Sequence, residues 1–262
     1  FVMTGMGDHR TGWVAQLPEI LAYAACWHAV YWLCYVIAPS LFVTFASLDA
    51  QKGEHGYWAA SMESTIHAVV ITYYALLALW QQPSLVTSDD FFEATPLSLF
   101  TARLFLGHIL SDFAVGLYYN TRWPGCLPNI CHHLFTTLSW MGMAAGGYAQ
   151  GSSLMLISCE ICTVFVNALW FLEKCGRQNS IFFKISGGLL LVLWFIFRII
   201  GYFSMAPRMY AHRHGLLTLP AVEIFVHVSC YCIGGVLMLM WFWQILNAAL
   251  NALKKMMSSK KQ

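Results

Sequence analysis

Ten ionisable side chains lie within long apolar segments of this sequence, and they are its first candidates for chemistry. An ionisable group at the depth of a bilayer is costly, so such groups usually face the interior of a helix bundle, pair with one another and mark a functional site. We therefore expect them to meet inside the molecule. They are Glu63, His67, His108, Asp112, His132, His133, Glu160, Arg198, Glu223 and His227.

Three acid–histidine pairs in this set share a spacing of four residues, which places both members on one face of a helix. A carboxylate beside a neutral histidine fixes its tautomer and stabilises the imidazolium, which suits a general base. The same pairs could instead satisfy each other and join neighbouring helices, so the spacing leaves both interpretations open. The pairs are Glu63/His67, His108/Asp112 and Glu223/His227.

The adjacent pair His132 and His133 is the sharpest feature. Neighbouring residues of a helix point about 100° apart, so both rings are sheltered only if other helices surround this one. Asp112 and Glu160 lie on the apolar segments before and after the pair and could both reach it. A catalytic or substrate-binding dyad, a metal site and a purely structural polar core all fit. We expect no metal, because a metal site normally includes further histidines or thiolates.

Arg198 stands alone in the apolar run LWFIFRIIGYF. An unpaired guanidinium is improbable there, so we expect it to meet Glu160, Asp112 or an acidic lipid headgroup. Asn167 and Thr163 share a segment with Glu160 and can donate hydrogen bonds to neighbouring helices.

The segments that must position these residues are those of a membrane protein. Hydrophobic residues make up 59% and charged residues 10% of the 262 residues, whereas soluble domains carry about 25% charged residues. Seven apolar runs predict an all-α integral membrane protein of about seven transmembrane helices, at roughly 20 residues each. A transmembrane barrel would instead show short segments of alternating polarity. The runs cover 19–46, 58–80, 99–119, 127–146, 151–172, 184–206 and 221–250.

Charge gives the expected orientation and excludes one class of partner. The net charge is +2 and the basic residues are scattered, so we expect no nucleic acid partner. A cytosolic C-terminus places nine Lys and Arg residues on the cytosolic side and four on the other, as the positive-inside rule favours. The sequence begins at Phe1, so we expect the true N-terminus to lie upstream.

Three stretches resemble the TLC-domain (TRAM/LAG/CLN) family, which includes the ceramide synthases. They are WAASMESTIHA at 58–68, GHILSDFAVGLY at 107–118, and the segment 132–174 that begins with the double histidine. The resemblance covers about 58–250 and implies a barrel of six helices around a cavity for a long lipid chain. It divides the chain into an N-terminal segment with an extra helix (1–56), a TLC domain (57–250) and a basic tail (251–262).

The segment after the double histidine departs from the ceramide synthase pattern. Ceramide synthases carry a His-Asp-x-Ser-Asp stretch and then Leu-Glu. The corresponding positions of this sequence keep a single acid, Glu160, so the chain looks closer to the TLC proteins that are not synthases. These positions are Cys159, Glu160, Cys162, Thr163, Val166 and Asn167.

The resemblance and the buried polar set together predict a protein that binds a lipid or acyl chain inside the membrane, in lipid metabolism or homeostasis. The alternatives are an acyl-CoA-dependent N-acyltransferase and a non-catalytic accessory subunit of a larger membrane complex. We expect no cofactor, with acyl-CoA as the candidate substrate, a membrane lipid as partner, and the endoplasmic reticulum or the mitochondrial inner membrane as location. The expected catalytic set is His132, His133, Asp112 and Glu160, and the expected substrate-binding set is His67, His108, Asn167 and Arg198.

Overall fold

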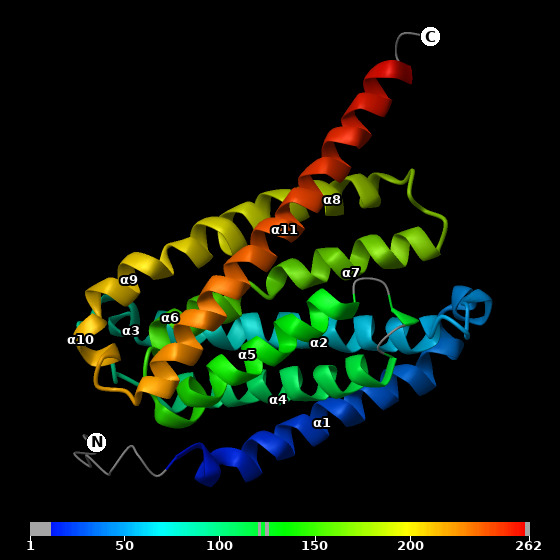
Figure 1. The fold of residues 1–262 in the computed structure, drawn as a ribbon. Helices are drawn as coiled ribbons and strands as arrows, with labels where there is room; N and C mark the ends of the chain where they lie inside the picture. Colours follow the sequence, from blue (N-terminus) through cyan, green and yellow to red (C-terminus); the bar gives the residue numbers. More distant parts are fainter. Residues whose placement is uncertain (1–11, 120–121, 124–125, 260–262) are drawn as a thin grey trace.

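The computed structural model describes residues 12–119, 122–123 and 126–259, and these contain helices and no strand. This confirms the all-α fold. The helices, shown in Figure 1, are α1 (Gly12–Leu41), η1 (Val43–Ser47), α2 (Glu54–Gln81), α3 (Ser84–Thr87), α4 (Pro96–Tyr119), α5 (Cys126–Gly146), α6 (Gln150–Ser158), α7 (Ile161–Lys174), α8 (Ile181–Leu193), η3 (Trp194–Gly201), α9 (Met205–Ala211), α10 (Arg213–Leu216) and α11 (Ala221–Ser259).

Six helical segments of the described chain are long and apolar enough to cross a membrane. They correspond to six of the seven predicted runs, and the chain is an integral membrane protein. The remaining run, 127–146, is α5, which contacts α4, α11 and α1 in the middle of the bundle. The spans are Ala15–Leu41, Glu54–Gln81, Pro96–Tyr119, Gln150–Lys174, Ile181–Ala211 and Ala221–Lys254.

Six long elements form a closed ring. Going round it, α2 packs on α4, α4 on α5, α5 on α11, α11 on α8, α8 on α7, and α7 on α2. The leading helix α1 lies outside this ring along one edge of the bundle, against α4 and α2 (Figure 1). Pro39 lies inside α1, two residues before its end at Leu41, and its nitrogen has no hydrogen to donate to the Tyr35 carbonyl oxygen.

Two of the spans that the sequence predicts as single helices are interrupted. The fifth is split at Cys159 and Glu160 into α6 and α7. In the sixth, α8 passes into the π-helix η3 before α9 begins. Hydrophobic periodicity extends through both interruptions, so it could not reveal them. π-Helical turns often mark functional sites, and η3 carries Arg198.

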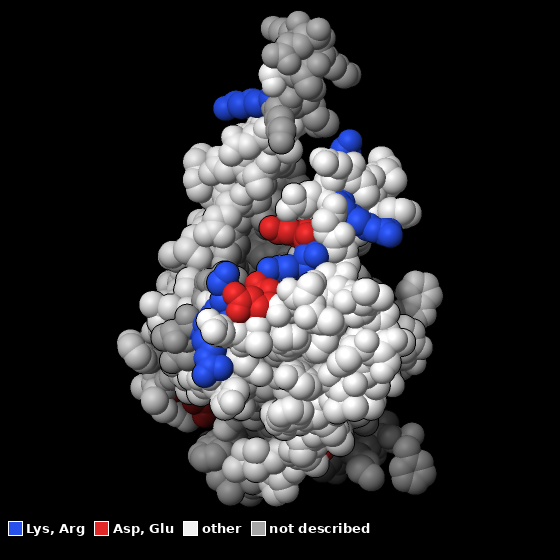
Figure 2. Space-filling view, turned by 90° about the vertical axis from the view of Figure 1, so that its right-hand side faces the viewer, with Lys and Arg blue, Asp and Glu red and all other residues white. Residues whose placement is uncertain are grey.

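Charged side chains gather at the ends of the bundle. Figure 2 shows one end, where Lys, Arg, Asp and Glu form a band across the surface. Lys174 Nζ lies 2.5 Å from Glu54 Oε1, and Lys52 Nζ lies 3.3 Å from Asp49 Oδ2. The flanks carry large exposed apolar side chains instead, such as Val69 in the middle of α2 and Val236 in the middle of α11. This distribution is the one that lipid on the flanks and water at the ends would favour.

Candidate functional site

A buried acid–histidine cluster lies between α1, α2 and α4. His108 Nδ1 is 2.9 Å from Glu63 Oε1, and both side chains are almost completely buried. The His67 ring stacks on the His108 ring with their centroids 3.5 Å apart. Trp27 of α1 meets both rings edge-on.

The pairing in this cluster differs from the one expected along each helix. Glu63 was expected beside His67, and His108 beside Asp112, but the structure joins Glu63 to His108 across two helices. Neither ring nitrogen of His67 has a hydrogen-bond partner among the residues that the structure describes. Spacing of four residues puts two groups on one face, but the partner on the facing helix comes closer.

The two adjacent histidines, His132 and His133, have different neighbours. His133 Nε2 lies 3.2 Å from Asp112 Oδ2. His132 points elsewhere, with its ring edge-on to Trp241 of α11 at a centroid distance of 5.4 Å. The two imidazole planes are inclined by 78°. Asp112 is thus the carboxylate that reaches the pair, through His133 alone.

Glu160 pairs with Arg198, which is one of the partners expected for that guanidinium. Arg198 Nη2 donates to Glu160 Oε1 at 2.9 Å, and Thr163 Oγ1 donates to Glu160 Oε2 at 3.0 Å. The Arg198 guanidinium also lies over the Trp194 ring, 4.9 Å from its centroid. The ion pair joins the two interrupted spans at their interruptions, since Glu160 lies between α6 and α7 and Arg198 in η3.

A cavity runs beside this ion pair between α5, α6, η3, α9 and α11. Its volume is about 170 Å³. Its walls are mostly apolar, with Phe135, Leu156 and Leu237 among the lining side chains. Three of the eight expected site residues line it, namely His132, Glu160 and Arg198.

The other five expected residues lie away from this cavity, in contacts between helices. His67, His108, Asp112 and His133 belong to the polar contacts described above. Asn167 joins α7 to α2, because its Nδ2 donates to the Ser61 carbonyl oxygen at 3.0 Å and to Ser64 Oγ at 2.8 Å. The structure therefore places the expected residues in two groups, of which one faces the cavity.

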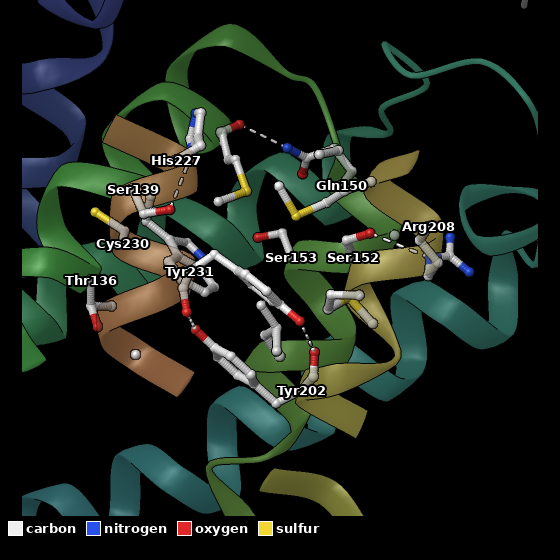
Figure 3. A pocket seen from close by; sticks show the side chains of 18 of the residues that line it. Thr136, Ser139, Gln150, Ser152, Ser153, Tyr202, Arg208, His227, Cys230 and Tyr231 are labelled. Carbon is white, nitrogen blue, oxygen red and sulfur yellow. Dashed lines mark hydrogen bonds between the residues drawn. The ribbon is translucent and has the colours of Figure 1, made fainter. Parts of the chain in front are cut away.

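A second polar network lies on the wall of the cavity. Ser139 Oγ is 3.2 Å from His227 Nδ1, and His227 Nε2 is 2.5 Å from Tyr148 Oη. Tyr148 Oη donates to Glu223 Oε2 at 3.1 Å. Figure 3 shows Ser139 and His227 joined across the cavity wall, with Tyr202 and Arg208 coming from the opposite side.

Sequence reasoning found half of this network. Glu223 and His227 were candidates because they lie in an apolar run, but Ser139 and Tyr148 were not. A serine in a membrane helix is common, and Tyr148 follows the turn at Gly146 and Gly147, where no periodicity relates it to a helix. The only local signal was a tyrosine placed directly after a glycine turn.

The mouth of the cavity carries charged groups of both signs. Arg208 Nη2 donates to the Val86 carbonyl oxygen at 2.7 Å. Ser84 Oγ donates to Glu93 Oε1, and Gln82 Nε2 donates to the same oxygen at 3.1 Å. These hydrogen bonds favour the carboxylate and hold the pKa of Glu93 below its ordinary value. Glu93 and Arg208 are both lining residues, so the entrance is polar although the walls are not.

No group of three His, Cys, Asp or Glu side chains that could hold a metal ion occurs in the described part of the chain. Cys159 and Cys162, which have a CxxC spacing, are buried free thiols. Cys159 Sγ lies 3.3 Å from the Phe197 carbonyl oxygen, so this thiol is engaged with the backbone of η3.

Comparison with known proteins gives a consistent family. The sequence model of the TLC domain (TRAM, LAG1 and CLN8) matches residues 57–247. Protein CLN8 of Homo sapiens is 25% identical over 237 residues, which are 82% of this chain and 75% of that protein. TLC domain-containing protein 4 A of Dictyostelium discoideum is 23% identical over 236 residues, 87% of this chain and 89% of that protein.

A third relative covers less of the chain. TLC domain-containing protein 1 of Mus musculus is 25% identical over 162 residues, 58% of this chain and 59% of that protein. The chain thus spans less than two thirds of the length of this relative. All three are TLC proteins other than ceramide synthases, which confirms the branch indicated by the residues after the double histidine. No solved structure matches the chain.

Proposed function

Because the chain belongs to the TLC-domain family, we propose that it binds a membrane lipid or a free acyl chain in the cavity between α5, α6, α9 and α11, in lipid metabolism or homeostasis. The observation that carries this proposal is the cavity itself. Its apolar walls separate a polar inner end, with His132, Glu160 and Arg198, from a polar mouth. Binding sites for small molecules commonly combine apolar walls with a few polar groups that fix orientation.

The distribution of polar and apolar side chains along the cavity suits an amphiphilic ligand. An acyl chain would lie along Phe135, Leu156 and Leu237, where it replaces water on apolar surface at roughly 25 cal/mol per Å². A polar group of the ligand would meet either Arg198 inside or the hydrogen-bonding groups at the mouth. If the cavity held only water, these apolar walls would stay hydrated and this stabilisation would be lost.

The direct test is mass spectrometry of lipids extracted from the purified protein. We expect a co-purified lipid in the unaltered chain and its loss in Leu156→Trp, whose indole would fill the cavity. Leu189→Trp is the matched control, because Leu189 is exposed on the flank of α8. Equal lipid content in both variants, or none in the unaltered protein, would reject the proposal.

The acyltransferase alternative depends on His132. Of the two adjacent histidines, His132 lines the cavity, so it is the one that could deprotonate an amine attacking a thioester. Such a base contributes about 10²–10⁴-fold to a rate, so His132→Ala should lose that much turnover of acyl-CoA with an amine acceptor. His133→Ala is the comparison, and full activity of the double variant would exclude this alternative.

We also propose the endoplasmic reticulum as the location, which is supported only by the resemblance to the ceramide synthases. Fluorescence of the tagged full chain together with an organelle marker tests it. Signal confined to mitochondria would contradict the proposal and favour the alternative location.

A further inference from the structure

We propose that Ser139 and His227 form a nucleophile–base pair on the cavity wall that acts on the carboxylic ester of an acyl lipid. This inference rests on the proposed lipid binding and gives the same cavity a chemical activity. A serine becomes an effective nucleophile when a histidine accepts its proton and a third group orients that histidine. The three parts are present here on α5, on α11 and in the turn before α6.

The reactive arrangement of the network assigns one proton to each bond. The Tyr148 hydroxyl donates its proton to Glu223 Oε2 at 3.1 Å. With that proton used, the tyrosine oxygen accepts from His227 Nε2, 2.5 Å away, and Nε2 carries the imidazole proton in this arrangement. The lone pair of Nδ1 then faces Ser139 Oγ at 3.2 Å. This is the tautomer that a base for Ser139 requires.

The backbone of α5 is shaped to admit this network. A Cβ atom added at Gly142 would lie 2.1 Å from Tyr148 Oη and 3.4 Å from His227 Nε2. Any other residue at this position would displace the tyrosine hydroxyl from the histidine. Gly142 lies one turn after Ser139, so the same helix supplies the nucleophile and the space for the group that orients its base.

The network faces the cavity and is shielded from bulk water. Ser139, Tyr148 and His227 all line the cavity, and each is at most 9% exposed. A network that only tied α5 to α11 would not require the serine hydroxyl to lie on the cavity wall. Figure 3 shows Ser139 beside His227, with a dashed line joining the two side chains.

Ser139 and His227 lie at a depth below the helix ends where the ester bond of a bound lipid would be. Ser139 lies seven residues before the end of α5 at Gly146, and His227 lies six residues after the start of α11 at Ala221. At 1.5 Å per residue both are about 10 Å inside the helix ends. An acyl chain that occupies the apolar part of the cavity, towards Arg198, would place its ester at this level and its headgroup at the mouth.

The first half of the reaction transfers the acyl group to Ser139 and needs no reagent besides the lipid ester. Ser139 Oγ attacks the carbonyl carbon and forms a C–O bond while His227 Nδ1 takes the hydroxyl proton. The ester C–O bond then breaks, and His227 returns the proton to the departing lipid alkoxide. Water or a second lipid hydroxyl, deprotonated by the same nitrogen, attacks the acyl-serine. That step releases the acyl group as an acid or as a new ester and restores Ser139.

A long-chain alkyl fluorophosphonate tests this directly, since an activated serine oxygen displaces its fluoride and keeps the phosphonyl group. We expect one adduct on the intact full chain by mass spectrometry, located at Ser139 by peptide mapping and absent in Ser139→Ala. His227→Gln should slow labelling by about 10²–10⁴-fold, the usual contribution of a general base. Ser47→Ala is the control, because Ser47 is exposed after α1, lies outside the cavity lining and should leave the adduct unchanged.

Tyr148 and Glu223 are positioning residues, and conservative variants separate their role from simple packing. The amide oxygen of Glu223→Gln still accepts the tyrosine proton, so this variant should label faster than Glu223→Leu. Tyr148→Phe should label as slowly as His227→Gln. Equal labelling rates in Glu223→Gln and Glu223→Leu, with both folded, would contradict the orienting role.

The lipid content of the same samples separates the two proposals. Co-purified lipid without an adduct at Ser139 would overturn the nucleophile and leave lipid binding intact. An adduct at Ser139 in a protein that holds no lipid would support the nucleophile and overturn lipid binding. Co-purified lipid retained in Ser139→Ala shows that this variant is folded, so its loss of labelling then reports the missing hydroxyl.

Discussion

At the scale of single residues, His67 and His108 are chemically alike, stacked on one another, and expected to respond oppositely to the same change. His108 bonds Glu63, whereas in the described part of the chain neither nitrogen of His67 has a hydrogen-bond partner. Removing one member of a buried pair leaves the other unsatisfied and costs roughly 1–3 kcal/mol, or more for a charge. His108→Phe should therefore lower the Tm in detergent, and His67→Phe should leave it unchanged or raise it. Equal losses in both variants would contradict the assigned pairing.

The Glu160–Arg198 pair allows a second prediction at this scale. Its side chains are 16% and 8% exposed, so a single replacement leaves a charge in apolar surroundings. Breaking a buried pair costs about 3–5 kcal/mol, whereas replacing both partners can be close to neutral. Glu160→Gln and Arg198→Met should each lower the Tm strongly, and the double variant should recover much of the loss.

The control for that cycle is the exposed pair Lys52–Asp49, whose side chains are 71% and 39% exposed. Exposed ion pairs contribute little to stability, so Lys52→Met should hardly change the Tm. Additive losses in the Glu160/Arg198 double variant would show that the two groups do not act as a pair.

The contacts that could be predicted from the sequence were those of charged side chains, because burying an unpaired charge is costly. Arg198 needed a carboxylate, and the structure supplies Glu160, which was one of the expected partners. The same argument gave Asp112 as a neighbour of the double histidine. It could not give Ser139 or Tyr148, because a neutral hydroxyl in an apolar segment has no comparable need for a partner and leaves no signal in spacing.

At the scale of elements, apolar runs located the helices but not their interruptions. The run at 58–80 corresponds to α2 and the run at 99–119 to α4, within a few residues. The interruptions at Glu160 and in η3 lie at a tertiary contact, the ion pair between them, which no local pattern encodes. The cavity depends on the same interruptions, since Glu160 and Arg198 both line it.

Close helix packing gives a prediction for two glycines. A Cβ atom at Gly151, at the start of α6, would lie 1.8 Å from the Leu85 carbonyl oxygen, which is backbone and cannot turn away. Gly188 in α8 has no atom within 4 Å of the same added carbon. Alanine in a helix is favoured over glycine by roughly 0.5–1 kcal/mol, so Gly188→Ala should raise the Tm slightly. Gly151→Ala should lower it by several degrees, and a rise there would contradict the α3–α6 contact.

At the scale of the whole molecule, α5 decides how the chain crosses the membrane. It is not among the six segments that hydropathy and length identify, yet it contacts α4 and α11 and has buried polar side chains such as His133 and Ser139. The ring of helices shields these groups from lipid, so a polar helix can cross. If α5 crosses, three spans separate the loop at 82–95 from Cys175, and these two points lie on opposite sides of the membrane.

Labelling with a membrane-impermeant maleimide in sealed vesicles, before and after permeabilisation, tests this crossing. Cys175 is exposed in the turn after α7, and Asp89→Cys adds a thiol in the exposed loop before α4. We expect Cys175 to react in vesicles whose cytosolic side faces out, because the basic end of the bundle should be cytosolic. The thiol at position 89, in a Cys175→Ser background, should react only after permeabilisation. Reaction of both from one side would mean that α5 does not cross, and the ring of six spans would then fail as a description of this protein in its membrane.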